Sequence, residues 1–277
     1  MKSLVAYALP IALTLSATTA AAQAPQPARS DAPLFTHRDA VAVGLATALT
    51  FAVTTLDRPI AESISDPGGW IQQNGFLGAR AKNFNVVNEQ SLTLAGLALY
   101  GVGRLSRSPT MADMSFHVAE AVATASIISQ IIRLPVGRER PIVNGNSGSR
   151  PFVFKPFKGL TSRDYRAFPS IHSSSGFAAA AVLSGEVARR WPEARWYASP
   201  VFYALAATPG LSRMYMNQHW ASDVFMGAFI GVVTGQKILR YNHSINPQNR
   251  VNRFFLGNDA GIATRDDRVI FRLTRTF

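Results

Sequence analysis

The sequence predicts an all-α protein, and three observations lead to this fold class. Apolar segments rich in Ala, Leu, Val and Gly recur along the chain, and most of them are too long for strands. Polar stretches or stretches containing Pro and Gly separate these segments, as helix boundaries require. With 47% hydrophobic residues in 277, the chain can bury a substantial core. We therefore expect a core bundle of six main helices.

Six apolar segments are expected to form these helices. In chain order they are Ala40–Leu56, Leu92–Leu105, Val118–Ile132, Phe177–Val187, Pro200–Leu211 and Val224–Leu239. The C-terminal tail, residues 246–277, is different because polar and apolar residues alternate there around Asn258–Gly261 and around Asp266-Asp267. This alternation predicts a small β-hairpin or strand pair at the end of the chain.

The N-terminus has the pattern of an export signal. Lys2 precedes an apolar stretch from Leu4 to Leu15, and small residues follow around Ala20–Ala24. This pattern predicts a secretory signal peptide over residues 1–22, with an uncleaved anchor as the alternative. A Pro-rich flexible link, residues 23–36, then leads into a helical domain over residues 37–245. We expect an exported, periplasmic protein.

Two further properties bear on the compartment and on the membrane. The chain has no cysteine, which excludes disulfides and thiolate zinc sites and suits an oxidising compartment. Its mean hydropathy is only +0.08, and most apolar runs are shorter than the roughly 20 residues of a membrane span. A cleaved leader followed by three crossings would also place Arg140 in the cytoplasm. We therefore favour a soluble or membrane-associated domain, with an integral membrane protein as the alternative.

The charge balance favours anionic partners. The chain has 28 Lys and Arg against 16 Asp and Glu, a formal net charge of +12. Phosphorylated substrates, acidic lipid head groups and nucleic acid all fit such a balance. Composition alone does not choose among these three classes.

One motif places a histidine beside a carboxylate. Ser212-Arg213 is followed after five residues by His219, and Asp223 lies four residues further on. On a helix, residues four apart share a face, so the carboxylate could fix the imidazole tautomer and leave the other nitrogen as a nucleophile or base. Arg213 adds a planar cation suited to a phosphate-like anion. An isolated His–Asp pair on a helix surface is the alternative.

A second motif supplies two more arginines. Arg133 and the Arg140-Pro141 pair are six residues apart, and Pro135 and Gly137 interrupt any helix between them. A chain that folds back there would bring both guanidinium groups to one spot, where they could neutralise a phosphoryl dianion. A basic loop at a helix end is the alternative reading.

The third motif is a helix start. Pro169-Ser170-Ile171-His172 precedes an alanine-rich run, and Ser170 is a favoured N-cap residue. The hydroxyl and backbone N–H of Ser170 could also donate to an anion at the helix N-terminus, with His172 placed to protonate a leaving oxygen. Helix capping and anion binding both remain open for this stretch.

In order and spacing, the three motifs resemble those of one superfamily. It joins type 2 phosphatidic acid phosphatases, bacterial non-specific acid phosphatases and vanadium-dependent haloperoxidases. The family pattern is Lys-x6-Arg-Pro, Pro-Ser-Gly-His and Ser-Arg-x5-His-x3-Asp. The resemblance covers about residues 118–239, and it implies the family's six-helix core of the acid phosphatase and haloperoxidase type.

The resemblance implies a mechanism that needs no metal or other cofactor. His219 would attack phosphorus and form a phosphohistidine, and Asp223 would orient His219. His172 would protonate the leaving alcohol and then activate water. The groups that would hold the phosphoryl oxygens are Arg133, Arg140, Arg213, Ser170 and the backbone N–H of Ile171.

Two positions depart from the family pattern. Arg133 replaces Lys, which keeps the charge but exchanges a point ammonium for a planar fork. Ile171 replaces Gly, which restricts the backbone dihedral φ and adds bulk beside the anion. We expect activity with a narrower site.

The resemblance predicts a metal-independent phosphatase acting on phosphomonoesters or on lipid phosphates and pyrophosphates, and no nucleic-acid partner. The phenylalanines of residues 144–166, interleaved with basic residues, would either seat a lipid head group at a membrane surface or pack on the core. One alternative is a haloperoxidase that binds vanadate, although such chains are usually much longer. Another is a degenerate phosphate- or lipid-binding protein. The sequence does not indicate an oligomeric state.

Overall fold

The structure is a computed structural model that describes residues 32–66, 68–84, 86–144, 150–257, 260–265 and 268–273. The predicted signal peptide and the first part of the link lie outside these residues. Each of the six predicted helices falls inside a long helix, so the all-α prediction is confirmed. These helices are α1 (His37–Ser65), α4 (Glu89–Leu105), α5 (Pro109–Val136), α6 (Ile171–Arg190), α7 (Arg195–Tyr215) and α8 (Ala221–Arg240).

Shorter elements complete the fold. The sequence analysis did not predict α2 (Trp70–Gln73), α3 (Gly75–Phe84) or α9 (Arg250–Phe255). A π-helical turn, Tyr241–Ile245, follows α8. The predicted hairpin is present as the antiparallel strands β1 (Ala260–Arg265) and β2 (Arg268–Leu273). Short 3₁₀ turns occur at Pro141–Asn144, Lys158–Leu160, Arg163–Tyr165 and Pro192–Ala194.

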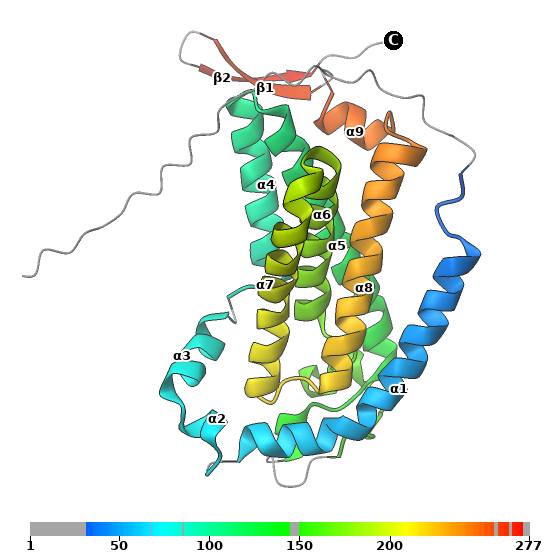
Figure 1. Cartoon of the computed structure of the whole chain (residues 1–277), viewed down its shortest axis with the longest axis vertical. Coiled ribbons are helices and arrows are strands. Elements are labelled where there is room, and N and C mark those ends of the chain that lie inside the picture. Colours follow the sequence, from blue (N-terminus) through cyan, green and yellow to red (C-terminus); the bar gives the residue numbers. More distant parts are fainter. Residues whose placement is uncertain are drawn as a thin grey trace, which may run out of the picture.

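The long helices form an antiparallel bundle with two ends (Figure 1). Helices α4 to α8 run side by side, and α1 crosses the outside of the bundle against α8. We call the end where α5 and α7 finish and α6 and α8 begin the lower end, as drawn in Figure 1. At the opposite, upper end lie α9 and the hairpin.

The tightest packing in the bundle is between α6 and α8, and it depends on small residues. Gly227, Gly231 and Gly235 recur every four residues on α8 and face the α6 backbone. A Cβ added to Gly231 would lie only 2.3 Å from the Ser174 carbonyl oxygen, so the two helices could not approach this closely with any other residue. Spacing of small residues at every fourth position is a known means of bringing two helix backbones into contact.

The outer surface of the bundle is unusually apolar. Helices α1 and α5 are long and apolar enough to cross a membrane, and only 11% of the most apolar window of α1 is buried. At 1.5 Å per residue the 20-residue helix α6 is about 30 Å long, which matches the hydrocarbon thickness of a bilayer. Large apolar side chains are exposed around the bundle, including Leu45, Leu49 and Phe51 on α1, Leu94 and Leu99 on α4, Ile127 and Ile131 on α5, and Val201 and Leu205 on α7.

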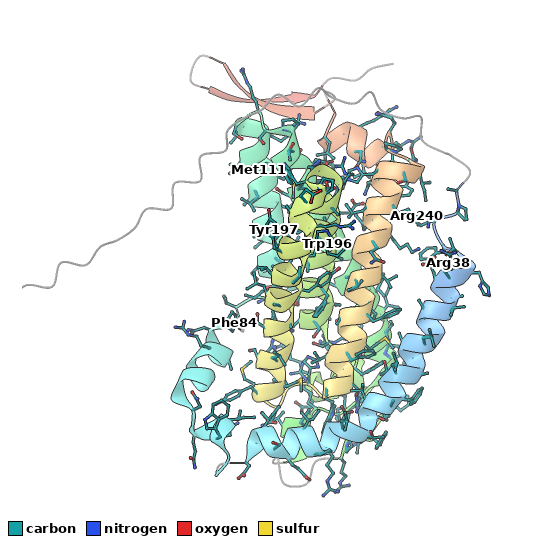
Figure 2. All side chains as sticks on the ribbon, in the orientation of Figure 1. Arg38, Phe84, Met111, Trp196, Tyr197 and Arg240 are labelled. Atoms are coloured by element: carbon teal, nitrogen blue, oxygen red, sulfur yellow. The ribbon has the colours of Figure 1, made fainter. Side chains whose placement is uncertain are left out.

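Aromatic residues mark one border of this apolar surface. Trp196 and Tyr197, at the start of α7, are 72% and 69% exposed, and Figure 2 shows them in the upper half of the bundle. Exposed Trp and Tyr side chains at helix ends are typical of membrane–water interfaces. The surface therefore favours the membrane-associated or integral alternatives over a soluble domain.

Candidate active site

The lower end begins with the turn that ends α5. Gly137 caps α5 with φ of +60°, and a Cβ there would lie 1.9 Å from the Lys155 carbonyl oxygen. Only glycine fits this left-handed position at such a close approach. The chain then folds back, as predicted: the Lys155 N–H donates to the Gly137 carbonyl at 2.8 Å, and Arg138 bridges to Phe154. This turn carries Arg138 and Arg140 to the starts of α6 and α8.

His219 is buried at the centre of the lower end, in the loop between α7 and α8. Its Nδ1 lies 2.7 Å from the Ala167 carbonyl oxygen and 3.6 Å from Asp223 Oδ2. A carbonyl can only accept, so Nδ1 carries the proton and donates it to Ala167. The lone pair is therefore on Nε2. Burial lowers the pKa of His219 to about 4, although Asp223 acts to raise it.

The orientation of the His219 ring thus depends on two groups, the Ala167 carbonyl and Asp223, whereas the sequence motif assigned this role to Asp223 alone. Asp223 lies beyond hydrogen-bond distance of the ring, and the backbone carbonyl of Ala167 makes the direct bond. Every residue has a backbone carbonyl, so no residue type in the sequence marks Ala167 as the acceptor. Asp223 still contributes a buried negative charge next to His219.

Asp223 is held by a buried ionic network that the sequence analysis missed. Arg138 donates to Asp223 Oδ1 at 2.6 Å and to Asp57 Oδ2 at 2.7 Å, and all three side chains are buried. Ser222 donates its N–H and its hydroxyl to Asp57. The network fastens the middle of α1 to the start of α8. Two features of the sequence point to this network: Asp57 directly follows an apolar run, and Arg138 is a third arginine inside the second motif.

His172 lies at the second position of α6, and its ring centroid is 6.4 Å from that of His219. Its Nε2 lies 2.6 Å from Arg213 Nη2, so this nitrogen accepts a hydrogen bond and the imidazole is neutral. Burial, together with the positive charge of Arg213, lowers the pKa of His172 to about 2. Its Nδ1 is buried without a hydrogen-bond partner.

The three predicted arginines converge beside these histidines. Arg213 contacts His172 directly, and the charges of all three arginines act to lower the pKa of His172, so each lies near this ring. Burial, followed by the charge of Arg213, lowers the pKa of Arg140 to about 10. Guanidinium groups this close repel one another, and a bound anion would offset the repulsion. Within this group of arginines, the Nε atoms of Arg133, Arg140 and Arg213 are buried and have no hydrogen-bond partner.

Ser170 and Ile171 begin α6 at the edge of this cluster. The Ser170 N–H donates to the Asp223 carbonyl oxygen at 3.0 Å, so it cannot donate to an anion as the sequence analysis suggested. The Ser170 hydroxyl caps the helix through Ser173, as predicted. Ile171 has a negative φ, so isoleucine in place of the family's glycine creates no backbone strain. Its N–H is among the first N–H groups of α6, which have no carbonyl one turn back.

An apolar cavity of about 510 Å³ lies between α1, α5 and α8 and reaches Arg138 of the buried network. Arg138, Phe154 and Phe168 border it near the buried network, and its other lining is apolar side chains and threonines. Phe152 and Phe157, in the preceding loop, are more than 60% exposed. Of the two alternatives for this loop, the exposure favours contact with an apolar partner over packing on the core.

Together these features define an all-α protein with a buried histidine among arginine donors that lack partners, an arrangement suited to a phosphate-like anion. Comparison with known families agrees. The profile of the PAP2 superfamily, the phosphatidic acid phosphatase type 2 group, matches residues 115–246, and the chain carries a PAP2 superfamily domain.

Two individual proteins are similar to this chain. A lipid A 1-phosphatase from Porphyromonas gingivalis is 29% identical over 168 residues, which are 60% of this chain and 33% of that protein. The chain thus spans about a third of the length of this curated relative. The crystal structure of a transmembrane PAP2-type phosphatidylglycerolphosphate phosphatase from Bacillus subtilis is similar with a TM-score of 0.53 and 18% identity, over 75% of this chain and 94% of that chain. This likeness shows that the fold is shared.

Proposed function

We propose that the protein is a membrane-embedded phosphatase that removes phosphate from a lipid phosphate through a phosphohistidine on His219. The observation that carries the proposal is the set of buried, unpartnered arginine nitrogens around the two histidines. Unpaired buried donors are costly, and a phosphoryl group would satisfy them. Three guanidinium groups would supply the positive charge that a metal ion supplies in other phosphatases.

In the first step, Nε2 of His219 attacks phosphorus and the bond from phosphorus to the leaving oxygen breaks. The proton on Nδ1 remains bonded to the Ala167 carbonyl, so the lone pair is kept on the attacking nitrogen. The positive charge that develops on the ring is stabilised by Asp223 at 3.6 Å. The geometry therefore favours His219 as nucleophile over His172.

His172 would act first as the general acid and then as the general base, and bound substrate would change the protonation state of its imidazole. Without substrate, Arg213 donates to His172 Nε2 and the imidazole is neutral. A bound phosphoryl dianion would draw Arg213 to itself and offset the nearby positive charges, which raises the pKa of His172. The protonated ring could then give its proton to the leaving alcohol. In the second step it would take a proton from the water that attacks phosphorus and releases phosphate from His219.

Arg138 is a positioning residue in this proposal. It holds Asp223 by a 2.6 Å ion pair and Asp57 by another at 2.7 Å, so it fixes the carboxylate beside His219 without reaching the reacting atoms itself. Because Asp57 belongs to α1, the outermost long helix also contributes to the placement of the nucleophile.

Three features favour a lipid as the substrate. The apolar surface of α1 and α5 could hold the bundle in a bilayer, with the lower end at one interface. The apolar cavity beside the site could take part of an acyl chain. The two similar proteins are phosphatases of lipid A at its 1-phosphate and of phosphatidylglycerolphosphate. Either of these two phosphomonoesters is a reasonable first substrate to test.

The proposal is tested by hydrolysis assays of the full chain in detergent micelles with a metal chelator present. We expect release of phosphate from a lipid phosphomonoester, with a kcat/KM at least tenfold above that for a soluble ester such as p-nitrophenyl phosphate. His37→Ala serves as the control for His219→Ala, because His37 is exposed and outside the site.

Two results would overturn the proposal. Equal hydrolysis rates for wild type and His219→Ala would refute the assignment of His219 as nucleophile and favour a non-catalytic binding protein. Halide oxidation with vanadate and peroxide, without hydrolysis of any ester, would favour the haloperoxidase alternative. If a soluble ester is hydrolysed faster than every lipid, the phosphatase activity is supported but the lipid substrate is ruled out.

A further inference from the structure

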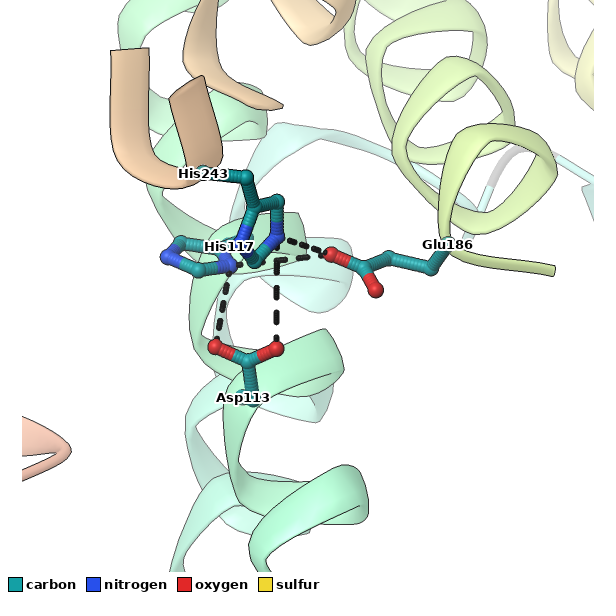
Figure 3. A group of neighbouring side chains, drawn as sticks. All are labelled: Asp113, His117, Glu186 and His243. Atoms are coloured by element: carbon teal, nitrogen blue, oxygen red, sulfur yellow. Dashed lines mark hydrogen bonds and ion pairs between the residues drawn. The ribbon is translucent and has the colours of Figure 1, made fainter. Parts of the chain in front are cut away.

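The upper end of the bundle holds a second cluster of ionisable side chains, about one helix length from His219. Asp113 and His117 come from the first turns of α5, Glu186 from the last turns of α6, and His243 from the π-helical turn after α8 (Figure 3). One ligand atom from each lies within 4.8 Å of every other. These residues lie outside the three sequence motifs: Asp113 and His117 are four residues apart, but Glu186 and His243 come from distant segments of the chain.

His117 is the observation that distinguishes this cluster from ordinary surface ion pairs. Its side chain is fully buried, and its Nδ1 has no hydrogen-bond partner. Nδ1 faces the cluster, at 3.5 Å from Asp113 Oδ1 and 3.9 Å from Glu186 Oε1 (Figure 3). A buried imidazole nitrogen aimed at carboxylate oxygens without bonding to them lacks a partner that a cation could supply.

The other side of the His117 ring fixes which nitrogen carries the lone pair. Nε2 lies 3.5 Å from Asn252 Oδ1, and the Asn252 amide donates its own N–H to the Pro247 carbonyl. The amide oxygen therefore faces the imidazole, so Nε2 donates and Nδ1 is unprotonated. Histidine ligands of metals usually have such a partner on the second nitrogen. Asn252 belongs to α9, which gives the C-terminal tail a role at this site.

The carboxylates divide their oxygens between two kinds of partner. Arg190 bonds Asp113 Oδ2 and lies 3.1 Å from Glu186 Oε2, and Arg189 lies 2.8 Å from the same Oε2. Asp113 Oδ1 instead faces His117, and Glu186 Oε1 faces both histidines, with His243 Nε2 at 2.5 Å. His243 Nε2 also lies 4.0 Å from Asp113 Oδ2. The arginines thus orient the carboxylates from outside and leave one oxygen of each on the inner side.

An opening to solvent reaches the cluster. A cavity of about 340 Å³ is bordered by Asp113, Arg190 and His243, among other residues. His243 is 20% exposed, whereas His117 and Glu186 are fully buried behind it. A cation could therefore enter past His243 and meet the buried ligands.

We propose that Asp113, His117, Glu186 and His243 form a binding site for a divalent transition metal ion, with zinc as the ion that fits best. Two imidazole nitrogens and two carboxylate oxygens are a ligand set that Zn²⁺ accepts in tetrahedral geometry. Zinc bonds of about 2.0–2.2 Å place neighbouring ligand atoms about 3.4 Å apart. The observed separations of 2.5, 3.5 and 3.9 Å lie on both sides of this value. The ion would clamp the ends of α5, α6 and α8 together.

The site is tested by titrating the metal-free full chain, without an affinity tag, with Zn²⁺ and Co²⁺. We expect one ion per chain, a Co²⁺ absorption spectrum of tetrahedral N/O type, and a melting temperature that rises with zinc concentration. His243→Gln and Glu186→Gln should each weaken zinc binding at least tenfold. His37→Ala should leave it unchanged, since His37 is exposed and outside the cluster.

Competition from the two histidines of the lower end is resolved with His219→Ala, which should keep the bound zinc. If wild type takes up no ion saturably, or if His243→Gln binds zinc as tightly as wild type, the proposal is wrong. Should a cluster variant fail to fold, X-ray absorption of the zinc in wild type decides. Two imidazole ligands together with oxygens at about 2.0 Å support the site, and any other ligand set refutes it.

Discussion

The two ends of the bundle use the same residue types for opposite purposes. Each end combines two buried or half-buried histidines with carboxylates and arginines. At the lower end, Arg138 and the Trp220 N–H bond the two oxygens of Asp223. The groups left without partners there are N–H donors, namely Nε of Arg133, Arg140 and Arg213 and Nδ1 of His172. At the upper end, Arg189 and Arg190 take the outer carboxylate oxygens, and His117 Nδ1 and Arg190 Nε are both left without a partner. Of these two nitrogens, His117 Nδ1 is the acceptor, and it faces the inner carboxylate oxygens.

This difference teaches that composition does not decide which ion a charged cluster binds. The deciding property is which donors or acceptors remain unpaired after the internal bonds are made. Unpaired donors predict an anion at the lower end, and an unpaired acceptor among carboxylates predicts a cation at the upper end. The following predictions test this contrast.

The largest effect is expected for the proposed nucleophile. His219→Ala should lower kcat for a lipid phosphate by about 10⁴-fold or more, because a covalent pathway is lost. His37→Ala should not change kcat. Initial rates of phosphate release, with circular dichroism to confirm folding, measure this. A loss below tenfold would show that the lower end acts without His219 as nucleophile.

The buried ionic network should come next. Arg138→Met leaves Asp57 and Asp223 unpaired, so we expect a loss of about 3–5 kcal/mol in the free energy of unfolding and about a hundredfold lower kcat with little change in KM. The matched control is Arg58→Met, because Arg58 makes an exposed ion pair with Glu62 that contributes about 0.5 kcal/mol. Equal effects of the two substitutions would refute the positioning role.

Acid should weaken the lower end through His219. Its pKa of about 4 is below the usual value of 6.5, so between these pH values the unfolded chain binds a proton that the folded chain does not. Stability is therefore fully present above pH 6.5 and falls as pH decreases, by on the order of 3 kcal/mol from this group. Denaturant titrations from pH 7 to 4 check this, and His219→Gln should reduce the dependence while the contribution of His172, whose pKa is also lowered, remains.

The turn that delivers Arg138 and Arg140 should tolerate only glycine. Gly137→Ala would place a Cβ 1.9 Å from the Lys155 carbonyl at a left-handed φ, so we expect a loss of about 2–3 kcal/mol. Gly101→Ala in α4 is the matched control, because nothing lies within 4 Å of its added Cβ. In a helix this substitution should stabilise by about 0.5–1 kcal/mol. Thermal unfolding that does not separate the two variants would contradict this account of the turn.

The smallest effect concerns the independence of the two ends. Removing metal with a chelator should lower the melting temperature and change kcat less than about twofold, because no proposed step uses the upper end. If activity depends fully on added zinc, catalysis at the lower end requires the metal at the upper end, and the arginine-based mechanism is contradicted.

The sequence predicted much more of the lower end than of the upper. The six helices follow from long apolar runs, and the motif residues follow from fixed spacings that the fold then brings together. The Ala167 carbonyl and the Asp57–Arg138 pair were missed because they arise from contacts between distant segments. The upper cluster was missed because only Asp113 and His117 are close in the sequence, four residues apart on α5, whereas Glu186 and His243 come from distant segments.

The most direct test of the central claim is to trap the covalent intermediate. We would use His172→Ala with p-nitrophenyl phosphate, whose leaving group needs no proton, so that the phosphoenzyme accumulates when water is no longer activated. After a rapid quench in alkali, mass spectrometry should locate a phosphate on the imidazole of His219, stable in alkali and lost in acid. Hydrolysis without any phosphorylated His219, or phosphate on a serine such as Ser170, would contradict the account.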